Sequence, residues 1–273
     1  MPQLVARGLT IDIDRPMIMA VINATPDSFS DAGKYATVEA RMERTREVLA
    51  QGADILDIGG QSAITGVPEI SEDEEIERIT PVIEWVATNT DAIMSIDTYR
   101  PAVAAAALDA GAHIINDIAA GRYDAQMLAT VAKHRAPYII MHMQGMPADM
   151  QRDPQYGNVL TEVIEFMSER VAACKEAGII DVIIDPGYGF GKTVQHNYTL
   201  LRNQRNFEMF NLPILAGVSR KSMVCKVLGV NPDKALNGTT AVNTLALLNG
   251  ANLLRVHDVK EAVECIKLVN KLK

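Results

Sequence analysis

Eight short apolar segments recur along this chain, and each ends in a polar residue that is followed by a turn or by the start of a helical pattern. These polar residues are Asn23, Asp57, Asp97, Asn116, His142, Asp185, Ser219 and Arg255. Apolar strands that alternate with helices predict a parallel sheet, because parallel neighbours need a crossover connection. Eight such units within 273 residues have the size of one (β/α)₈ TIM barrel, an α/β fold.

The predicted barrel strands cover residues 17–22, 54–58, 92–96, 113–117, 138–142, 182–185, 214–218 and 252–257. A helix is predicted over residues 72–87, where Ile76, Ile79 and Ile83 fall on one face. Ser71 and Glu74 form a capping box before it. Residues 4–13 alternate between apolar and polar, which predicts a short N-terminal β-hairpin that caps the barrel bottom. No interdomain linker is found, so residues 1–273 are expected to form a single domain.

Composition narrows the class of function. The chain has 26 basic and 34 acidic residues, a net charge of −8, which argues against general attraction to nucleic acid or to an anionic membrane. No apolar run approaches the ~18 residues of a membrane span, and the N-terminus lacks a signal-peptide pattern. Cys174, Cys225 and Cys265 are scattered and odd in number, which fits a reducing compartment. We therefore expect a cytoplasmic protein without a disulfide framework.

The chemistry of the strand-end residues indicates a flat heterocyclic ligand. Asp97, Asn116 and Asp185 together offer hydrogen-bond acceptors and one amide. A carboxylate can accept two N–H bonds from an amidine-like edge, and asparagine can bond in both directions. A 2-amino-4-oxo pterin or a guanine has such an edge. Lys221 follows the seventh predicted strand, where it is placed to bind a ring oxygen.

Other strand-end residues indicate an anion near the heterocycle. Arg255 and His257 lie two residues apart on the last strand and therefore point the same way, toward an anion or a stacked ring. Asn23 is a hard oxygen ligand available to Mg²⁺ and to a diphosphate. The alternative is that strand-end Asp and Asn residues only cap the helices that follow. The convergence of so many of them at one barrel mouth favours a binding site.

Seven segments resemble those of the dihydropteroate synthase family, in the family's order and over nearly the whole chain. They are NATPDSFSD at residues 23–31, SIDT at 95–98, IND at 115–117, MHMQG at 141–145, DPGYGFGK at 185–192, SRKS at 219–222 and RVHD at 255–258. The resemblance implies a transferase of folate biosynthesis. It would condense 6-hydroxymethyl-7,8-dihydropterin diphosphate with p-aminobenzoate to give 7,8-dihydropteroate and diphosphate.

The resemblance also implies roles for residues. The pterin-binding residues would be Asp97, Asn116, Asp185, Lys221 and Arg255. Asn23, Arg255 and His257 would bind the diphosphate, with Asn23 also a ligand of the cofactor Mg²⁺. The p-aminobenzoate pocket would be lined by Phe29, Ala63, Phe190, Lys221 and Ser222. The catalytic residues would be Asp97, Lys221, Arg255 and His257. In this family diphosphate leaves first, and the aryl amine then captures a pterin methylene cation. The family is usually a homodimer, and sulfonamide inhibitors compete with p-aminobenzoate.

One loop departs from the family pattern. Residues 61–66 read QSAITG, whereas the family usually has Glu-Ser-Thr-Arg-Pro-Gly. Ala63 and Ile64 therefore replace a hydroxyl and a guanidinium, so we expect unequal changes in affinity for p-aminobenzoate and for sulfonamides. Two alternatives follow: an impaired or non-catalytic pterin-binding paralogue, and a pterin-dependent methyltransferase. Retention of residues 23–31 argues against the first. Retention of Lys221 and of Arg255 with His257 argues against the second.

Overall fold

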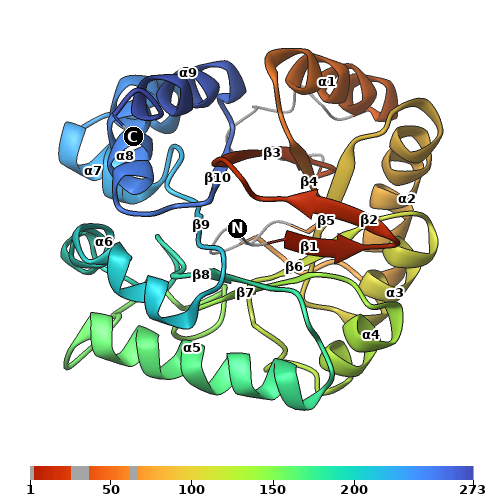
Figure 1. Cartoon of the computed structure of the whole chain (residues 1–273), viewed down its shortest axis with the longest axis horizontal. Helices are drawn as coiled ribbons and strands as arrows, with labels where there is room; N and C mark the ends of the chain where they lie inside the picture. Colours follow the sequence, from red (N-terminus) through yellow and green to blue (C-terminus); the bar gives the residue numbers. More distant parts are fainter. Residues whose placement is uncertain (1–2, 26–36, 62–66, 273) are drawn as a thin grey trace.

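The computed structural model describes residues 3–25, 37–61 and 67–272, which contain eight parallel strands arranged as a barrel (Figure 1). The strands are β3 (Met17–Asn23), β4 (Ile55–Gly59), β5 (Ile93–Asp97), β6 (Ile114–Asp117), β7 (Tyr138–Met141), β8 (Val182–Asp185), β9 (Leu215–Ala216) and β10 (Leu253–Val256). Their order is β8-β7-β6-β5-β4-β3-β10-β9. A parallel bridge between Ile184 and Ile214 joins the two ends of this order. The predicted (β/α)₈ fold is confirmed.

Helices surround the strands on the outside of the barrel (Figure 1). They are α1 (Val38–Gln51), α2 (Glu72–Asn89), α3 (Pro101–Asp109), α4 (Gln126–His134), α5 (Val159–Glu176), α6 (Val194–Arg202), α7 (Ser222–Leu228), α8 (Leu236–Leu248) and α9 (Val259–Val269), with short 3₁₀ helices at Gln204–Phe210 and Pro232–Lys234. The helix predicted at residues 72–87 is confirmed as α2. The Ser71 side chain caps it by accepting from the Glu74 backbone N–H, and the Glu74 carboxylate pairs with Arg78 at 2.5 Å.

The seventh barrel strand is shorter than predicted. Residues 214–218 were expected to be extended throughout, but β9 spans only Leu215–Ala216. Pro213 precedes this segment and lacks a backbone N–H, so it cannot continue the ladder as a donor. Gly217 follows β9 at the point where the Lys221 ammonium and the Arg255 side chain approach the backbone.

The predicted hairpin is present as β1 (Gln3–Ala6) and β2 (Leu9–Asp12), which pair in antiparallel register. Arg7 and Gly8 form its turn, and both have positive φ, as a tight two-residue hairpin turn requires. Buried apolar side chains of the hairpin pack into one cluster with inward-facing residues of the barrel strands: Leu4, Ala6, Ile11, Ile13, Met17, Met19, Ile55, Ile114, Ile139, Ile183, Leu215 and Leu253. The hairpin therefore closes the barrel bottom, as predicted.

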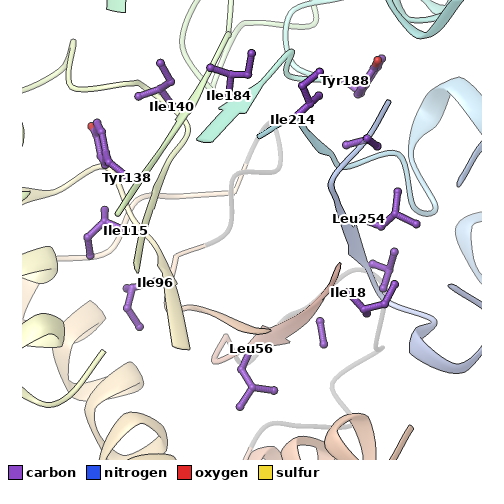
Figure 2. Close-up of a cluster of buried hydrophobic side chains, with 14 of the residues drawn as sticks. Ile18, Leu56, Ile96, Ile115, Tyr138, Ile140, Ile184, Tyr188, Ile214 and Leu254 are labelled. Atoms are coloured by element: carbon purple, nitrogen blue, oxygen red, sulfur yellow. The ribbon is translucent and has the colours of Figure 1, made fainter. Parts of the chain in front are cut away.

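The two-residue period of the strands decides which side chains reach the barrel interior. Ile18, Leu56 and Ile96 point outward into the core beneath the helices (Figure 2). Their neighbours one residue along each strand point inward. The same alternation turns Asp57, the residue after Leu56 and the middle residue of β4, toward the interior. Inward-facing residues near the carboxyl ends of the strands therefore form the barrel mouth, which is where barrel enzymes bind their substrates.

The structure also bears on membrane-spanning helices and on the state of the cysteines in the described residues. None of their helices is both long enough and apolar enough to span a membrane. Cys174, Cys225 and Cys265 are free thiols, as expected, and Cys174 and Cys265 are buried.

Candidate active site

Arg255 lies at the centre of the barrel mouth and links three strands. Its Nε donates to Asp57 Oδ2 at 2.6 Å, and its Nη2 donates to Asp97 Oδ2 at 2.7 Å. Asn116 donates from Nδ2 to the same Asp57 oxygen at 3.1 Å. These four residues, from β4, β5, β6 and β10, form what we call the Arg255 cluster. Their side chains fix one another before any ligand arrives.

Burial and charge oppose each other in this cluster. Burial raises the pKa of Asp97 to about 7, although Arg255 acts to lower it. Burial alone would lower the pKa of Arg255, but the carboxylates of Asp57 and Asp97 outweigh that effect and raise it. Asp57 Oδ1 is buried and has no hydrogen-bond partner among the described residues. A buried carboxylate oxygen of this kind favours a ligand N–H or a water molecule beside it.

Asp185 approaches the same mouth from the end of β8. Its side chain is buried, and its Oδ1 accepts from the Gly187 backbone N–H at 2.7 Å. Burial raises the pKa of Asp185, and Lys221 opposes the shift. Gly187 has a φ of +72, and a Cβ at this position would lie 1.8 Å from the His142 carbonyl oxygen. Only glycine therefore allows the turn after Asp185 to lie this close to the end of β7.

Lys221 faces Asp185 across the mouth, from the residue that precedes α7. Its Nζ donates to the Tyr188 carbonyl at 2.5 Å and lies 4.6 Å from the centroid of the Phe190 ring. Burial lowers the pKa of Lys221 to about 8, and Asp185 opposes the shift. The ammonium therefore carries its charge at neutral pH, between a carboxylate and an aromatic face. Ser222, the first residue of α7, is exposed beside it.

His257 lies at the edge of the mouth, just after β10. Its Nδ1 is 3.1 Å from Ser219 Oγ, which also accepts from the His257 backbone N–H at 3.2 Å. The His257 carbonyl accepts from Arg44 Nη2 at 2.7 Å. Arg220 forms a two-bond ion pair with Asp258. Two guanidinium groups that the sequence did not assign to the site therefore lie nearby: that of Arg44 bonds to the His257 carbonyl, and that of Arg220 bonds to the adjacent Asp258.

The structure brings together most of the residues predicted from sequence. Asp97, Asn116, Asp185, Lys221 and Arg255 share the mouth through the contacts described above. Asn23 ends β3 beside Gly59 in the β3–β4 register. Phe190 lies at the Lys221 side of the mouth, whereas Phe29 and Ala63 lie outside the described residues. The prediction that assigned them to the p-aminobenzoate pocket remains a prediction.

Sequence reasoning assigned no role to Asp57, although it placed this residue in the polar ring. Its signal was its inward-facing position in the middle of β4, in register with Ser95 of β5. Nothing in the local sequence indicated that it would meet Arg255, which lies 198 residues away. His142 was likewise placed in the polar ring without a role, and Lys192 was assigned none; the structure buries both beneath the mouth.

The residues of the mouth fit Mg²⁺ only in combination with a substrate. Among the described residues, no group of three or more His, Cys, Asp or Glu side chains could hold a metal ion. Asn23 supplies one amide oxygen, which is a suitable hard ligand. Protein-bound Mg²⁺ commonly keeps several waters and takes its remaining ligands from substrate phosphates. One asparagine at the rim is consistent with that mode of binding.

The two shifted pKa values predict a bell-shaped pH profile for kcat/KM. Asp97 is charged only above about 7, so activity should fall below that pH as the carboxylate is protonated. Lys221 is charged only below about 8, so activity should fall above that pH as the ammonium loses its proton. Initial rates between pH 5.5 and 9.5 measure both limbs. In Lys221→Arg the alkaline limb should move upward, because a guanidinium stays protonated there. An unchanged alkaline limb in that variant would exclude Lys221 as its origin.

A barrel mouth with paired carboxylates, an amide and two partly buried cations is suited to an N–H-rich heterocycle that carries an anionic group. Residues 19–257 match the family model described as "Pterin binding enzyme". The fold, the site and this match define the class of the chain as a pterin-binding barrel enzyme.

More specific similarities narrow the class. The chain is 41% identical over 269 residues to dihydropteroate synthase of Escherichia coli strain K12, covering 98% of this chain and 95% of that protein. A structure of Yersinia pestis dihydropteroate synthase in a sulfonamide drug complex superposes with a TM-score of 0.96 at 41% identity, covering 99% of each chain. Xanthomonas albilineans dihydropteroate synthase with 4-aminobenzoic acid gives a TM-score of 0.92 at 40% identity, covering 99% and 98%. This chain belongs to the dihydropteroate synthase family.

Proposed function

We propose that the barrel mouth performs the dihydropteroate synthase reaction with the residues described above. The protein is a transferase of folate biosynthesis that binds pterins, and the 41% identity to dihydropteroate synthase favours this function over that of a pterin-dependent methyltransferase. The observation that carries the proposed mechanism is the Arg255 cluster facing the Asp185–Lys221 pair. It combines acceptors for a heterocycle with a cation beside the position where negative charge would develop.

Asp185, Asp97 and Asn116 are proposed to hold the pterin. A carboxylate accepts two N–H bonds from the amino-pyrimidine edge, and such charge-assisted bonds are stronger than neutral ones. Lys221 would donate to the ring oxygen from its place opposite Asp185. Asp57 would offer the pterin one more acceptor, because its Oδ1 has no hydrogen-bond partner among the described residues.

Arg255 and His257 are proposed to stabilise the departing diphosphate. Departure of diphosphate leaves a pterin methylene cation, which the carboxylates of Asp97 and Asp185 would favour electrostatically. Bound Mg²⁺ would supply positive charge that draws electrons from the breaking bond, and Asn23 would hold it together with substrate oxygens. Arg255 is already fixed by two carboxylates, so it needs little reorganisation as the leaving group develops its charge.

p-Aminobenzoate is proposed to enter beside Phe190 and Lys221. The Phe190 ring offers an aromatic face, and Lys221 with Ser222 offers donors near the start of α7. Attack by the aryl amine on the methylene cation forms the C–N bond, and the amine then loses one proton. Sulfonamides would occupy the same pocket as inhibitors. This route requires no covalent intermediate with the protein.

The direct test is formation of 7,8-dihydropteroate and release of diphosphate by the purified protein. Turnover is expected with pterin diphosphate, p-aminobenzoate and Mg²⁺, and removal of Mg²⁺ with EDTA should stop it. A parallel Ala63→Thr/Ile64→Arg variant restores the usual loop residues. Its KM for p-aminobenzoate should fall by about tenfold, if one charge-assisted bond of roughly 1.5 kcal/mol is regained. Failure of both proteins to form dihydropteroate would refute the proposed function.

We further propose that the protein is a homodimer that uses the helices at the end of the chain. Six of the twelve exposed large apolar side chains in the described residues lie on or next to α7, α8 and α9: Val227, Leu228, Leu245, Leu248, Leu268 and Leu272. These helices contact one another in sequence order. Monomers rarely expose so concentrated a set of apolar side chains, and a second copy of this chain would cover it.

Sedimentation velocity tests this arrangement. The native protein should sediment as a dimer, and Leu245→Glu/Leu248→Glu should sediment as a monomer, because a buried charge opposes association. Ile180→Glu is the matched control, because Ile180 is also highly exposed but lies just after α5. A dimer that survives the double substitution would rule out this surface.

The three free cysteines favour a location of the protein in the cytoplasm, where thiols stay reduced.

A further inference from the structure

A buried lysine lies directly beneath the mouth, and it is not one of the residues with a proposed role in the reaction. Lys192 ends the glycine-rich turn between β8 and α6, and only 2% of it is exposed. Its Nζ lies 2.8 Å from the Gly187 carbonyl oxygen and 3.0 Å from that of Phe190. It also lies 3.2 Å from the carbonyl oxygen and 2.9 Å from Nδ1 of His142. Four acceptors from two different turns thus converge on one amino group.

Burying this group is unfavourable unless its hydrogen bonds are satisfied. Burial lowers the pKa of Lys192 far below its ordinary value, and Asp185 opposes the shift. The amino group has at least two N–H donors, and the surrounding acceptors can satisfy all of them. The core could have been filled with an apolar side chain at much lower cost. What the lysine adds is a fixed connection between the turn after β7 and the turn after β8.

His142 completes this connection as an acceptor. Burial, then Lys192 and Arg122, lower the pKa of His142 to about 2, so its imidazole is neutral. Its Nδ1 can then accept from Lys192, which places the imidazole proton on Nε2. The ring also packs edge-to-face against Phe166 with centroids 4.9 Å apart. The imidazole is therefore held in place from the helix side as well.

The glycine-rich turn to which Lys192 bonds also supplies the contacts of Lys221. The Tyr188 carbonyl accepts from Lys221, and the Phe190 ring lies under the Lys221 ammonium. Three glycines, at positions 187, 189 and 191, have positive φ, so the turn has little intrinsic preference for this conformation. Hydrogen bonds from side chains must therefore fix it. The Tyr156 hydroxyl, for example, donates to the Gly191 carbonyl at 2.8 Å.

We propose that Lys192 is a positioning residue of the synthase, which acts with His142 to set the height and orientation of Phe190 and of the Tyr188 carbonyl against Lys221. It does not touch substrate. Its action is on the p-aminobenzoate side of the mouth, because Phe190 and Lys221 border that pocket. This inference rests on the proposed function and deepens it.

Kinetics of Lys192→Met test the proposal, since methionine keeps most of the side-chain length without the donors. The KM for p-aminobenzoate should rise by about tenfold or more, as expected for a displaced substrate contact, with kcat reduced less than about threefold. The double variant Lys192→Met/Phe190→Ala should have the KM of Phe190→Ala alone, because both changes remove the same contact. Lys175→Met, on the exposed side of α5, is the matched control and should behave like the native protein.

Several outcomes would overturn the proposal. A lower kcat with an unchanged KM for p-aminobenzoate would mean that Lys192 only determines how much of the protein is folded. If the double variant raised the KM by the product of the two single effects, Lys192 would not act through Phe190. Lys192→Gln keeps donors of shorter reach and should recover part of the KM change. If both Lys192 variants fail to fold, the lysine serves the whole fold and the proposal is wrong.

A crystal structure of Lys192→Met separates this inference from the proposed function. Displacement of the Phe190 ring from the Lys221 ammonium supports the positioning role, even if the native protein forms no dihydropteroate. An unchanged ring position overturns it, even if the native protein is fully active.

Discussion

Arg255→Met should abolish most of the activity and destabilise the fold at the same time. The substitution leaves Asp57 and Asp97 together without the guanidinium that bridges them at 2.6 and 2.7 Å. Removing one partner of a buried ion pair typically costs about 3–5 kcal/mol of unfolding free energy. Loss of a positioned group that stabilises developing charge typically lowers kcat by about 10²–10³. Urea unfolding and the rate of diphosphate release measure the two effects separately.

A second substitution can separate the stability effect from the catalytic one. Asp57→Asn added to Arg255→Met removes one of the two uncompensated charges, and it should recover part of the lost stability. Activity should stay low, because the cation beside the leaving group is still absent. Recovery of activity together with stability would show that Arg255 acts only through the fold.

Arg15→Met is the matched control for Arg255→Met. Arg15 also pairs with an aspartate, Asp54, but this pair lies at the start of β4, at the opposite end of the barrel, and the Arg15 side chain is 53% exposed. Exposed pairs contribute about 0–1 kcal/mol. This variant should therefore unfold near the native urea concentration and keep full activity.

Asp185→Asn should weaken pterin binding strongly while leaving the fold intact. The asparagine oxygen can still accept from the Gly187 backbone N–H, so the turn after β8 keeps its local bond. What is lost is a charge-assisted contact with the pterin, of about 1.5–3 kcal/mol, which corresponds to roughly 10- to 150-fold in affinity. Isothermal titration with a pterin measures the change. An unchanged dissociation constant would remove Asp185 from the site.

The stability of this variant should not fall in parallel. Burial raises the pKa of Asp185, which means that the folded state disfavours the charged form. A neutral side chain removes that penalty. Asp117→Asn is the matched control, because Asp117 is equally buried at the end of β6. The Asp117 carboxylate accepts from Ala119, Gly121 and the Tyr138 hydroxyl on the outer side of the barrel. That variant should lose stability and keep its pterin affinity.

Much of the fold could be predicted because segments with two different spacings of apolar residues alternate regularly along the chain. Apolar strands with a period of two and helices such as α2 with a period near 3.6 leave few architectures other than a barrel. Each strand boundary was predicted to within one residue, except that β9 ends two residues earlier than predicted. There the apolar pattern of residues 214–218 did not reveal that Pro213 and Gly217 would limit the ladder to two residues. Apolar character alone does not report which backbone groups can pair.

The candidate site was predictable to the extent that its residues stand at the inward ends of strands. Asp97, Asn116, Asp185 and Arg255 meet that condition, and the barrel geometry brings them together. The partner of each residue was not predictable. A single strand-end aspartate looks the same in sequence whether it pairs with an arginine, as Asp57 does, or caps a turn from the outer side, as Asp117 does.

The sequence by itself determined the barrel, the direction in which each strand-end side chain points, and the chemistry available at the mouth. Those properties follow from local periodicity and residue type. Only the tertiary structure decided that Arg255 would reach across β3 to Asp57, and that Lys192 would be buried against His142 instead of facing solvent. Both facts depend on distances between residues that are far apart in the chain, and such distances are set when the barrel closes. The electrostatics of the site follow from that closure, because burial and neighbouring charges shift each pKa.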